Sequence, residues 1–146
     1  MKHVTKKLVI RRLLKAERKR VFSALSDPVK MANWFYGMER GQARVMCDFR
    51  IGGKYCVEMF NEESQCVATG EYLEIVPPEK LVFTWSNDGL VKNSKVTIEL
   101  FAKGDQTELV LTHELPQDVI ERHQHGWANC LDHLEALLGK TARRST

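Results

Sequence analysis

The longest regular hydrophobic pattern lies near the carboxyl end of the chain, in residues 117–138. Apolar side chains recur there at steps of three and four, which places them on one face of a helix. Pro116 precedes the segment, Asp118 is a candidate N-cap, and Gly139 is typical of a helix end. A helix with one apolar face needs a surface to cover it. The residues of the predicted apolar face are Ile120, His123, Trp127, Cys130, Leu131, Leu134, Leu137 and Leu138.

In the middle of the chain the pattern changes to a period of two. Alternating apolar and polar side chains are typical of strands with one buried face. Turn segments such as Gly52-Gly53 and residues 87–89 separate the runs at hairpin spacing, and Gly70 predicts a bulge or bend inside one run. The predicted strands cover residues 44–50, 54–60, 66–76, 81–86, 94–103 and 106–115.

The amino-terminal part of the chain predicts one strand followed by two short helices. Residues 7–14 are rich in β-branched and apolar side chains, which favours a strand. Residues 15–25 contain good helix formers and an apolar helical face. Asp27 can cap a second helix over residues 29–35, because Pro28 suits a first helical position.

The predicted order is therefore a strand, two helices, five or six antiparallel strands and a long helix. Consecutive hairpins favour an antiparallel sheet, and a strongly bent sheet could enclose the long apolar helix. The fold class is α+β. We expect one domain over residues 7–139 and a disordered tail over 140–146, since 146 residues suit a single core.

Composition and charge exclude several classes of protein. The chain is 43% hydrophobic and 28% charged, with a formal net charge of +3, which is ordinary for a globular protein. The basic residues gather near the two ends and are interpreted as solvated surface charge. They are not interleaved with exposed aromatic residues, so the sequence does not predict nucleic-acid binding.

The sequence predicts a cytoplasmic protein that does not bind membranes. No apolar run reaches the length of a membrane span, and no signal-peptide core follows Met1. The cysteines have neither the spacing of a redox pair nor that of a disulfide framework, so we expect free thiols. They are Cys47, Cys56, Cys66 and Cys130.

The strand alternation and the helix face point a set of apolar and aromatic residues towards one another. Such a lining suits an apolar ligand, with a few polar side-chain tips to orient it. The alternative is a filled core in which the same residues pack against each other. The predicted cavity lining consists of Trp34, Tyr55, Val57, Met59, Tyr72, Phe83, Trp85, Ile98, Leu111, His113, His123, Trp127 and Leu131.

His113 is the residue most suggestive of chemistry. It is in phase with Leu109 and Leu111 at the end of a strand, so its imidazole is expected to point inward. A half-buried imidazole could bind a ligand or act as a base near neutral pH. The alternative is a structural histidine whose nitrogens are satisfied by other groups of the protein.

Other histidines near the carboxyl end raise the question of a metal site. His123 and His125 are two positions apart on a helix and point nearly opposite ways, so they cannot share a metal. Cys130 and His133 are suitably spaced, but a full ligand set is missing. No nucleophile-elbow motif, phosphate-binding loop or Rossmann fingerprint occurs either, so we expect no metal and no cofactor.

Nearly the whole chain, from about Leu8 to Leu138, resembles the activator of heat-shock-protein-90 ATPase homologue family. This family belongs to the START-like and birch-pollen-allergen-like helix-grip superfamily. The residues that carry the resemblance are Ala16-Glu17, Val21-Phe22, Leu25-Ser26-Asp27-Pro28, Trp34, Gly52-Gly53-Lys54-Tyr55, Gly70-Glu71-Tyr72-Leu73-Glu74-Ile75, Pro77-Pro78, Leu81-Val82-Phe83-Thr84-Trp85, Val96-Thr97, Thr107-Glu108-Leu109, Gly126-Trp127, Leu131 and Leu134.

The resemblance implies a helix-grip fold with a cavity between the sheet and the long helix. Proteins similar in this way bind lipids, hormones or polyketides, include a few cyclase-type enzymes, or stimulate the chaperone ATPase, which connects them with stress response. Our leading hypothesis is a small binding protein, rather than an enzyme, that holds an apolar or amphipathic small molecule.

Two alternatives remain open at the level of the sequence. One is a co-chaperone-like module that stimulates a chaperone ATPase through exposed residues such as 38–44 or the basic first helix. The chain is expected to be a lone domain, without the separate amino-terminal domain of the eukaryotic activator. The other is an enzyme that uses His113 as a base. We expect a monomer or a weak homodimer.

Overall fold

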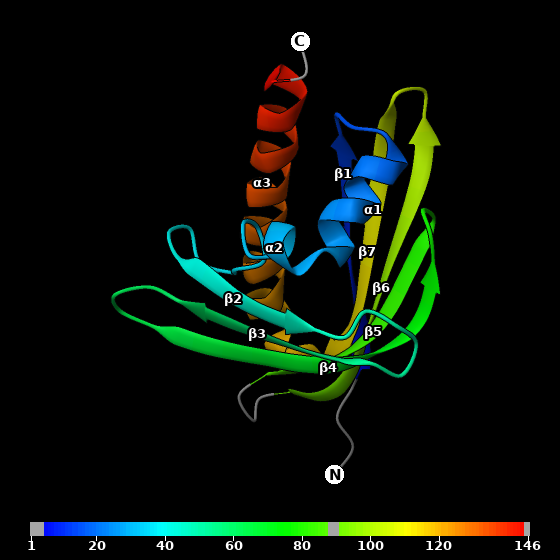
Figure 1. Cartoon of the computed structure of the whole chain (residues 1–146). Helices are drawn as coiled ribbons and strands as arrows, with labels where there is room; N and C mark the ends of the chain where they lie inside the picture. The colour runs from blue at the N-terminus through cyan, green and yellow to red at the C-terminus, as the bar shows by residue number, and fades with distance from the viewer. Residues whose placement is uncertain (1–4, 88–90, 145–146) are drawn as a thin grey trace.

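The computed structural model describes residues 5–87 and 91–144, which form one curved sheet and a long helix (Figure 1). The sheet has seven antiparallel strands in the order β1-β7-β6-β5-β4-β3-β2. The strands are β1 (Thr5–Leu14), β2 (Gln42–Cys47), β3 (Lys54–Phe60), β4 (Gln65–Val76), β5 (Lys80–Asn87), β6 (Val91–Lys103) and β7 (Gln106–Pro116).

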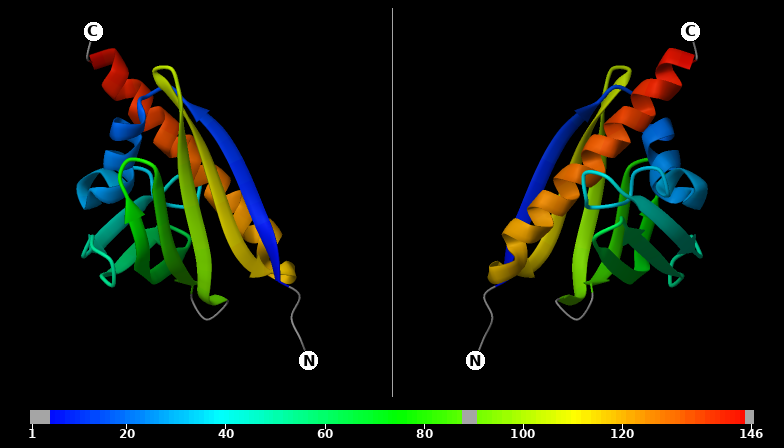
Figure 2. Two further views of the ribbon diagram at one scale, coloured as in Figure 1. Left: turned by 90° about the vertical axis from the view of Figure 1, so that its right-hand side faces the viewer. Right: turned by 90° about the vertical axis from the view of Figure 1, so that its left-hand side faces the viewer.

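The helices lie on the inner side of the sheet. The short helices α1 (Arg18–Ser26) and α2 (Pro28–Met31) follow β1, and a 3-10 turn, η1 (Gln117–Val119), leads into α3 (Ile120–Arg144). Figures 1 and 2 show the sheet curving around α3, with α1 and α2 beside it. None of the helices in the described part of the chain is long and apolar enough to cross a membrane.

The predicted α+β architecture is confirmed, with six strands after the two short helices. Each predicted strand agrees with the structure to within about three residues at either end. Asp27 caps α2, because its Oδ1 accepts a hydrogen bond of 2.9 Å from the Val29 N–H. Of the turn predicted at residues 87–89, positions 88 and 89 lie outside the described residues.

Two predicted helix ends are wrong. The second helix ends at Met31 instead of continuing to Phe35, since the rings of Trp34 and Phe35 stack in parallel with centroids 4.6 Å apart. Neighbouring side chains of an α-helix point too far apart to stack in this way. At the carboxyl end, α3 continues through Gly139 to Arg144.

Gly139 does not end the helix because its φ is not positive, which the αL stop would require. The tail predicted from residue 140 therefore begins as helix, and residues 145 and 146 lie outside the described part of the chain. Asp118 is not the N-cap of this helix either, since it lies inside the 3-10 turn.

Gly70 is needed for a close approach between strands rather than for a bulge. A Cβ at this position would lie 1.9 Å from the carbonyl oxygen of Thr84 in the neighbouring strand β5. The register shift between β4 and β5 falls further along, between Tyr72 and Glu74. The irregularity bends the sheet here, which helps it to curve around α3.

The core fills the space between the sheet and α3. The inward positions predicted from alternation are buried, including Val57, Leu109, Leu111 and His113 with no measurable exposure. On the predicted apolar face of α3 the exceptions are Ile120 and Leu137, which are only partly buried. The predicted curved sheet with a buried helix face is therefore confirmed at the level of individual positions.

Arg12 departs from the prediction that basic residues near the amino terminus are solvated surface charge. Its guanidinium lies on the inner face of β1, 2.8 Å from Asp132 Oδ1 and 3.3 Å from Glu135 Oε1 of α3. The Arg12 side chain is 23% exposed, whereas those of Asp132 and Glu135 are 63% and 44% exposed, so solvent still screens the two ion pairs. Arg12 thus joins the edge strand to the long helix.

Candidate functional site

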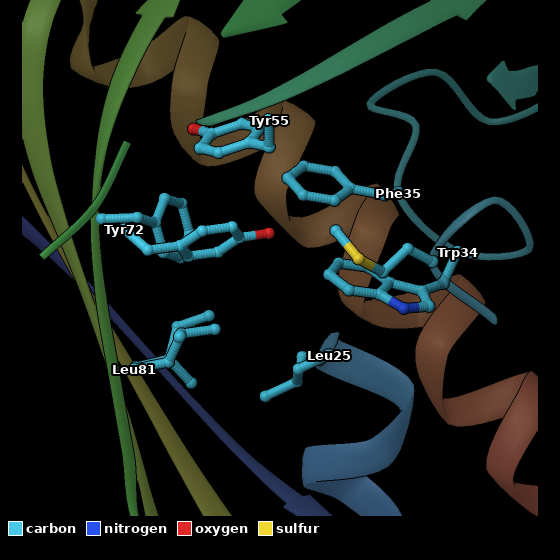
Figure 3. A pocket seen from close by; sticks show the side chains of 9 residues that line it. Leu25, Trp34, Phe35, Tyr55, Tyr72 and Leu81 are labelled. Carbon is cyan, nitrogen blue, oxygen red and sulfur yellow. The ribbon is translucent and has the colours of Figure 1, made fainter. Parts of the chain in front are cut away.

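The centre of the fold contains almost no empty space. A cavity of about 10 Å³ lies between α1, α2 and strands β3 to β6, which is room for about one water molecule. Figure 3 shows the Tyr72 hydroxyl pointing into it, opposite Leu25 and Phe35. The Tyr55 hydroxyl points away and donates a hydrogen bond of 2.6 Å to the Thr84 carbonyl. This region is a filled core.

A larger pocket lies between the amino-terminal half of α3 and strands β3, β4 and β5. Its volume is about 390 Å³, which falls in the range of small-molecule sites. Most of its wall is apolar or aromatic, and the exposed Arg122 and His125 lie at its rim. The lining residues are Gly37, Met38, Met59, Ser64, Cys66, Trp85, Asn87, Arg122, His123, His125, Gly126, Trp127 and Cys130.

One wall of this pocket is the segment after α2, which is held on α3 by side chains of the helix. Asn129 Nδ2 donates to the Gly37 carbonyl at 2.9 Å, and His133 Nε2 bonds the Met38 carbonyl at 3.0 Å. A Cβ on Gly37 would lie 3.2 Å from the Gly126 Cα, so the absence of a side chain on Gly37 lets the segment approach α3 closely. The pocket is therefore preformed by the fold.

His113 belongs to a buried chain of hydrogen bonds that runs between two residues of the pocket wall, Trp127 and Trp85. The Trp127 indole N–H donates to His113 Nδ1 at 3.0 Å, which makes Nδ1 an acceptor. The neutral imidazole then carries its proton on Nε2, which lies 2.8 Å from Ser94 Oγ. The Ser94 hydroxyl in turn donates to the Trp85 carbonyl at 2.8 Å.

This chain leaves His113 no lone pair with which to accept a proton from a ligand. Burial lowers the pKa of His113 to about 3, and the nearby His123 imidazole acts in the same direction. A general base must reach its substrate and be able to take up a proton near the working pH. The geometry therefore favours the structural interpretation of His113 over the catalytic one.

His123 and Trp85 differ from His113 because each has a ring nitrogen that faces no partner in the protein. His123 Nδ1 bonds the Val119 carbonyl at 2.8 Å, while its buried Nε2 has no hydrogen-bond partner. The buried Trp85 Nε1 also has none. Both side chains line the larger pocket. Burial lowers the pKa of His123, so the ring is neutral near pH 7.

The other candidate metal ligands near the carboxyl end go to separate places. His125 is exposed at the pocket rim, and His133 bonds the Met38 carbonyl and stacks on Tyr36 with ring centroids 4.0 Å apart. Cys130 is buried, and burial raises the pKa of its thiol, so the sulfur stays protonated. A neutral thiol adds to the apolar wall rather than serving as a nucleophile.

The predicted lining residues are divided between these regions. All are buried, but they do not enclose a single large cavity. Val57, Leu111, His113 and Leu131 line neither the central cavity nor the larger pocket. The central cavity is lined by Trp34, Tyr55, Tyr72, Phe83 and Ile98, and the larger pocket by Met59, Trp85, His123 and Trp127.

Sequence reasoning missed several residues that shape the site. Ser94 is in phase with Val96 and Ile98, so the alternation already carried the signal that it points inward. Asn129 and His133 are polar positions on α3 whose partners are carbonyls far away in the sequence. No sequence pattern marks such contacts, because any carbonyl of the chain could be the partner.

Replacing Gly126 by alanine should stabilise the protein. Alanine favours a helix interior over glycine by about 0.5–1 kcal/mol. A Cβ on Gly126 would meet only the Gly37 Cα, at 3.9 Å, and a Cβ on Gly139 would meet nothing within 4 Å. We expect Gly126→Ala and Gly139→Ala to raise the free energy of unfolding equally in urea titrations. A loss in Gly126→Ala alone would show that the approach of Gly37 requires glycine.

The curved antiparallel sheet closed around a long carboxy-terminal helix defines a helix-grip protein of the START-like class. The sequence model described as "Activator of Hsp90 ATPase homolog 1-like protein" matches residues 15–139, and the chain belongs to this family. The predicted resemblance is therefore confirmed. No curated protein sequence matches the chain.

Solved structures share the fold over most of the chain. Protein CV1439 from Chromobacterium violaceum is 30% identical, with a TM-score of 0.80, and the match covers 90% of this chain and 96% of that one. An uncharacterised protein from Rhizobium leguminosarum is 26% identical, with a TM-score of 0.82 and coverage of 95% and 97%. DynU16, from the dynemicin biosynthetic locus, is 18% identical, with a TM-score of 0.74 and coverage of 91% and 47%.

Proposed function

We propose that the protein binds an apolar or amphipathic small molecule in the larger pocket, between the amino-terminal half of α3 and strands β3 to β5. The observation that carries this proposal is the hollow of about 390 Å³ beside a core that is otherwise filled. Apolar ligand surface buried there would contribute roughly 25 cal/mol per Å². The likeness to DynU16 supports no more than the fold.

The proposed binding residues are those predicted residues that line this pocket. Met59 and Trp127 supply apolar and aromatic surface, while Trp85 and His123 combine apolar rings with polar nitrogens. The segment at Gly37 and Met38, which the sequence did not indicate, completes the wall. Because hydrogen bonds hold this segment on α3, ligand binding would cost little ordering of the chain.

The test is native mass spectrometry of the purified protein, combined with extraction of any compound that co-purifies. We expect a stoichiometric apolar compound that is lost in the Gly126→Leu variant, whose side chain would occupy the pocket. Gly139→Leu is the matched control, since Gly139 lies on the same helix and lines neither cavity. The control should retain the compound.

Two results would contradict small-molecule binding in the larger pocket. A clean apo mass, with no thermal shift from a library of lipids and aromatic acids, would count against small-molecule binding. Equal retention of a compound by Gly126→Leu and the parent protein would place the binding site elsewhere.

A co-chaperone role is the second proposal, and the family description supports it. It requires an exposed surface such as residues 38–44 or the basic first helix, α1, but two of the basic residues of α1 have partners within the chain. Arg18 Nη1 lies 3.7 Å from Glu79 Oε1, and Arg20 Nη2 donates a hydrogen bond of 3.0 Å to the Leu138 carbonyl. Residues 38–44 include exposed charged side chains, so a chaperone contact would involve this segment.

We further propose that the protein works in the cytoplasm as a monomer or weak homodimer, without nucleic-acid or membrane partners. Within the described part of the chain Cys47, Cys56 and Cys130 form no disulfide, which supports a reducing compartment. The chaperone proposal and the small-molecule proposal make different demands: a chaperone contact should survive Gly126→Leu, whereas ligand binding should not.

A further inference from the structure

Two buried polar groups in the larger pocket define what kind of ligand it would take. Trp85 and His123 are each only 5% exposed, yet Trp85 Nε1 and His123 Nε2 have no hydrogen-bond partner within the protein. Leaving such groups buried and unpaired is energetically unfavourable. A ligand that pairs both of them would remove this cost, whereas a purely apolar ligand would keep it.

The hydrogen-bonding role of each group follows from its surroundings. The Val119 carbonyl only accepts hydrogen bonds, so His123 Nδ1, at 2.8 Å, carries the proton. His123 Nε2 is then a bare acceptor in the neutral ring. The indole nitrogen of Trp85 can only donate. Two residues of the pocket wall therefore carry one unpaired donor and one unpaired acceptor, both buried just beneath its surface.

The two groups belong to neighbouring aromatic rings that both line the pocket. The Trp85 and His123 rings pack edge to face with centroids 6.4 Å apart. The ring centroids of Trp127 and Trp85 lie 5.1 Å apart. Flat aromatic surfaces of this kind favour a flat aromatic ligand. The charged group of the pocket, Arg122, is exposed at the rim rather than beside the pair.

We propose that the pocket selects uncharged aromatic alcohols, whose hydroxyl donates to His123 Nε2 and accepts from the Trp85 N–H. A hydroxyl combines a donor and an acceptor in one atom, so it complements both nitrogens. A methyl ether lacks the donor, and a carboxylate would place negative charge against the His123 lone pair. This assignment rests on the proposed small-molecule function and specifies the ligand class of the same pocket.

The test compares probes of one shape and different polarity by calorimetric titration at neutral pH. The probes are β-naphthol, its methyl ether, naphthalene and β-naphthoate. We expect β-naphthol to bind about threefold to tenfold more tightly than the ether or naphthalene, as expected for one neutral hydrogen bond or more. β-Naphthoate should bind more weakly than β-naphthol.

Heteronuclear NMR of the indole N–H groups provides a second readout. The Trp34 N–H donates to the Ala24 carbonyl at 2.8 Å and the Trp127 N–H to His113, so both are already occupied. The Trp85 indole signal alone should acquire a hydrogen-bond shift that β-naphthol causes and naphthalene does not.

Variants test whether the two nitrogens cause the preference for β-naphthol over naphthalene. Trp85→Phe and His123→Phe keep aromatic rings but remove the donor and the acceptor. Each should reduce the preference for β-naphthol over naphthalene, because one of the two hydrogen bonds is lost, and the ratio within one variant cancels any general loss of folding. The control is His125→Phe at the exposed rim, which should keep the preference.

The possible outcomes separate the ligand class from the binding function. Equal affinity for β-naphthol and naphthalene, or tightest binding of β-naphthoate, would overturn the assignment of aromatic alcohols while binding itself stands. A preference of unchanged size in both Trp85→Phe and His123→Phe would overturn it as well. Failure of every probe to bind would count against the proposed function and this inference together.

Discussion

Replacing Trp127 by alanine should lower the free energy of unfolding by about 3–5 kcal/mol, the range for deleting a buried aromatic side chain. The Trp127 side chain is 3% exposed and packs on Phe35 and Trp85, with ring centroids 5.6 Å and 5.1 Å away. The substitution also removes the N–H that satisfies His113 Nδ1. Urea unfolding followed by circular dichroism would measure the loss.

The Trp127→Phe variant separates the ring from the hydrogen bond. It keeps most of the packing but leaves His113 Nδ1 buried without a donor, which we expect to cost about 1–3 kcal/mol. Trp127→Ala should therefore lower the free energy of unfolding more than Trp127→Phe does. If Trp127→Ala cost less than Trp127→Phe, the ring would not be part of the core as described.

Acid should destabilise the protein strongly, beginning below about pH 6.5. The pKa of His113 is lowered by burial to about 3 in the folded protein, whereas an exposed histidine titrates near 6.5. Between these two values the unfolded chain binds a proton that the folded chain does not. The free energy of unfolding should then fall by about 1.4 kcal/mol for each pH unit of acidification.

His123 should add to the loss of stability in acid, because burial lowers its pKa too. The groups that face His113 are Ser94, Trp85, Trp127 and His123, and none of them is a carboxylate that could stabilise an imidazolium. Urea titrations at several pH values between 4 and 7 would give the slope.

The His113→Asn variant is the informative comparison for the acid effect. Asparagine can accept from the Trp127 N–H but cannot take up a proton, so the slope with pH should decrease even though stability at neutral pH is lower. His125→Asn is the matched control, since that side chain is exposed, and its slope should equal that of the parent. An unchanged slope in His113→Asn would assign the acid effect to other groups.

The architecture followed from the sequence because local periodicity determines which face of each element is buried. Tyr72, Phe83 and Ile98 sit on different strands, yet alternation alone placed all three inside, where the structure has them. Helix ends were less predictable. Gly139 continues α3, and the stacking of Trp34 on Phe35 ends α2, which are outcomes of contacts beyond the local sequence.

The location of the pocket could not be predicted for a related reason. Whether an inward residue fills a core or lines a hollow depends on how closely the opposing element approaches, and Val57 and Leu111 are buried completely. The approach of Gly37 to Gly126 brings two distant segments together and sets one wall of the pocket. Alternation and the helix face placed the side chains with polar tips inside as a group, where they are buried, but only the partners seen in three dimensions distinguish the satisfied His113 from His123.

The position of β1 at the edge of the sheet has a consequence for how the chain is made. β1 is synthesised before the other described strands, but its only strand partner among them is β7, with Ile10 opposite Leu111. At ribosomal rates the wait for β7 is on the order of 5–20 s. During this interval Leu8 and Leu14, which are buried in the native fold, have no sheet to join. The nascent chain therefore carries an unpaired apolar strand until β7 has been translated, and the pairing of β1 is a late step of folding.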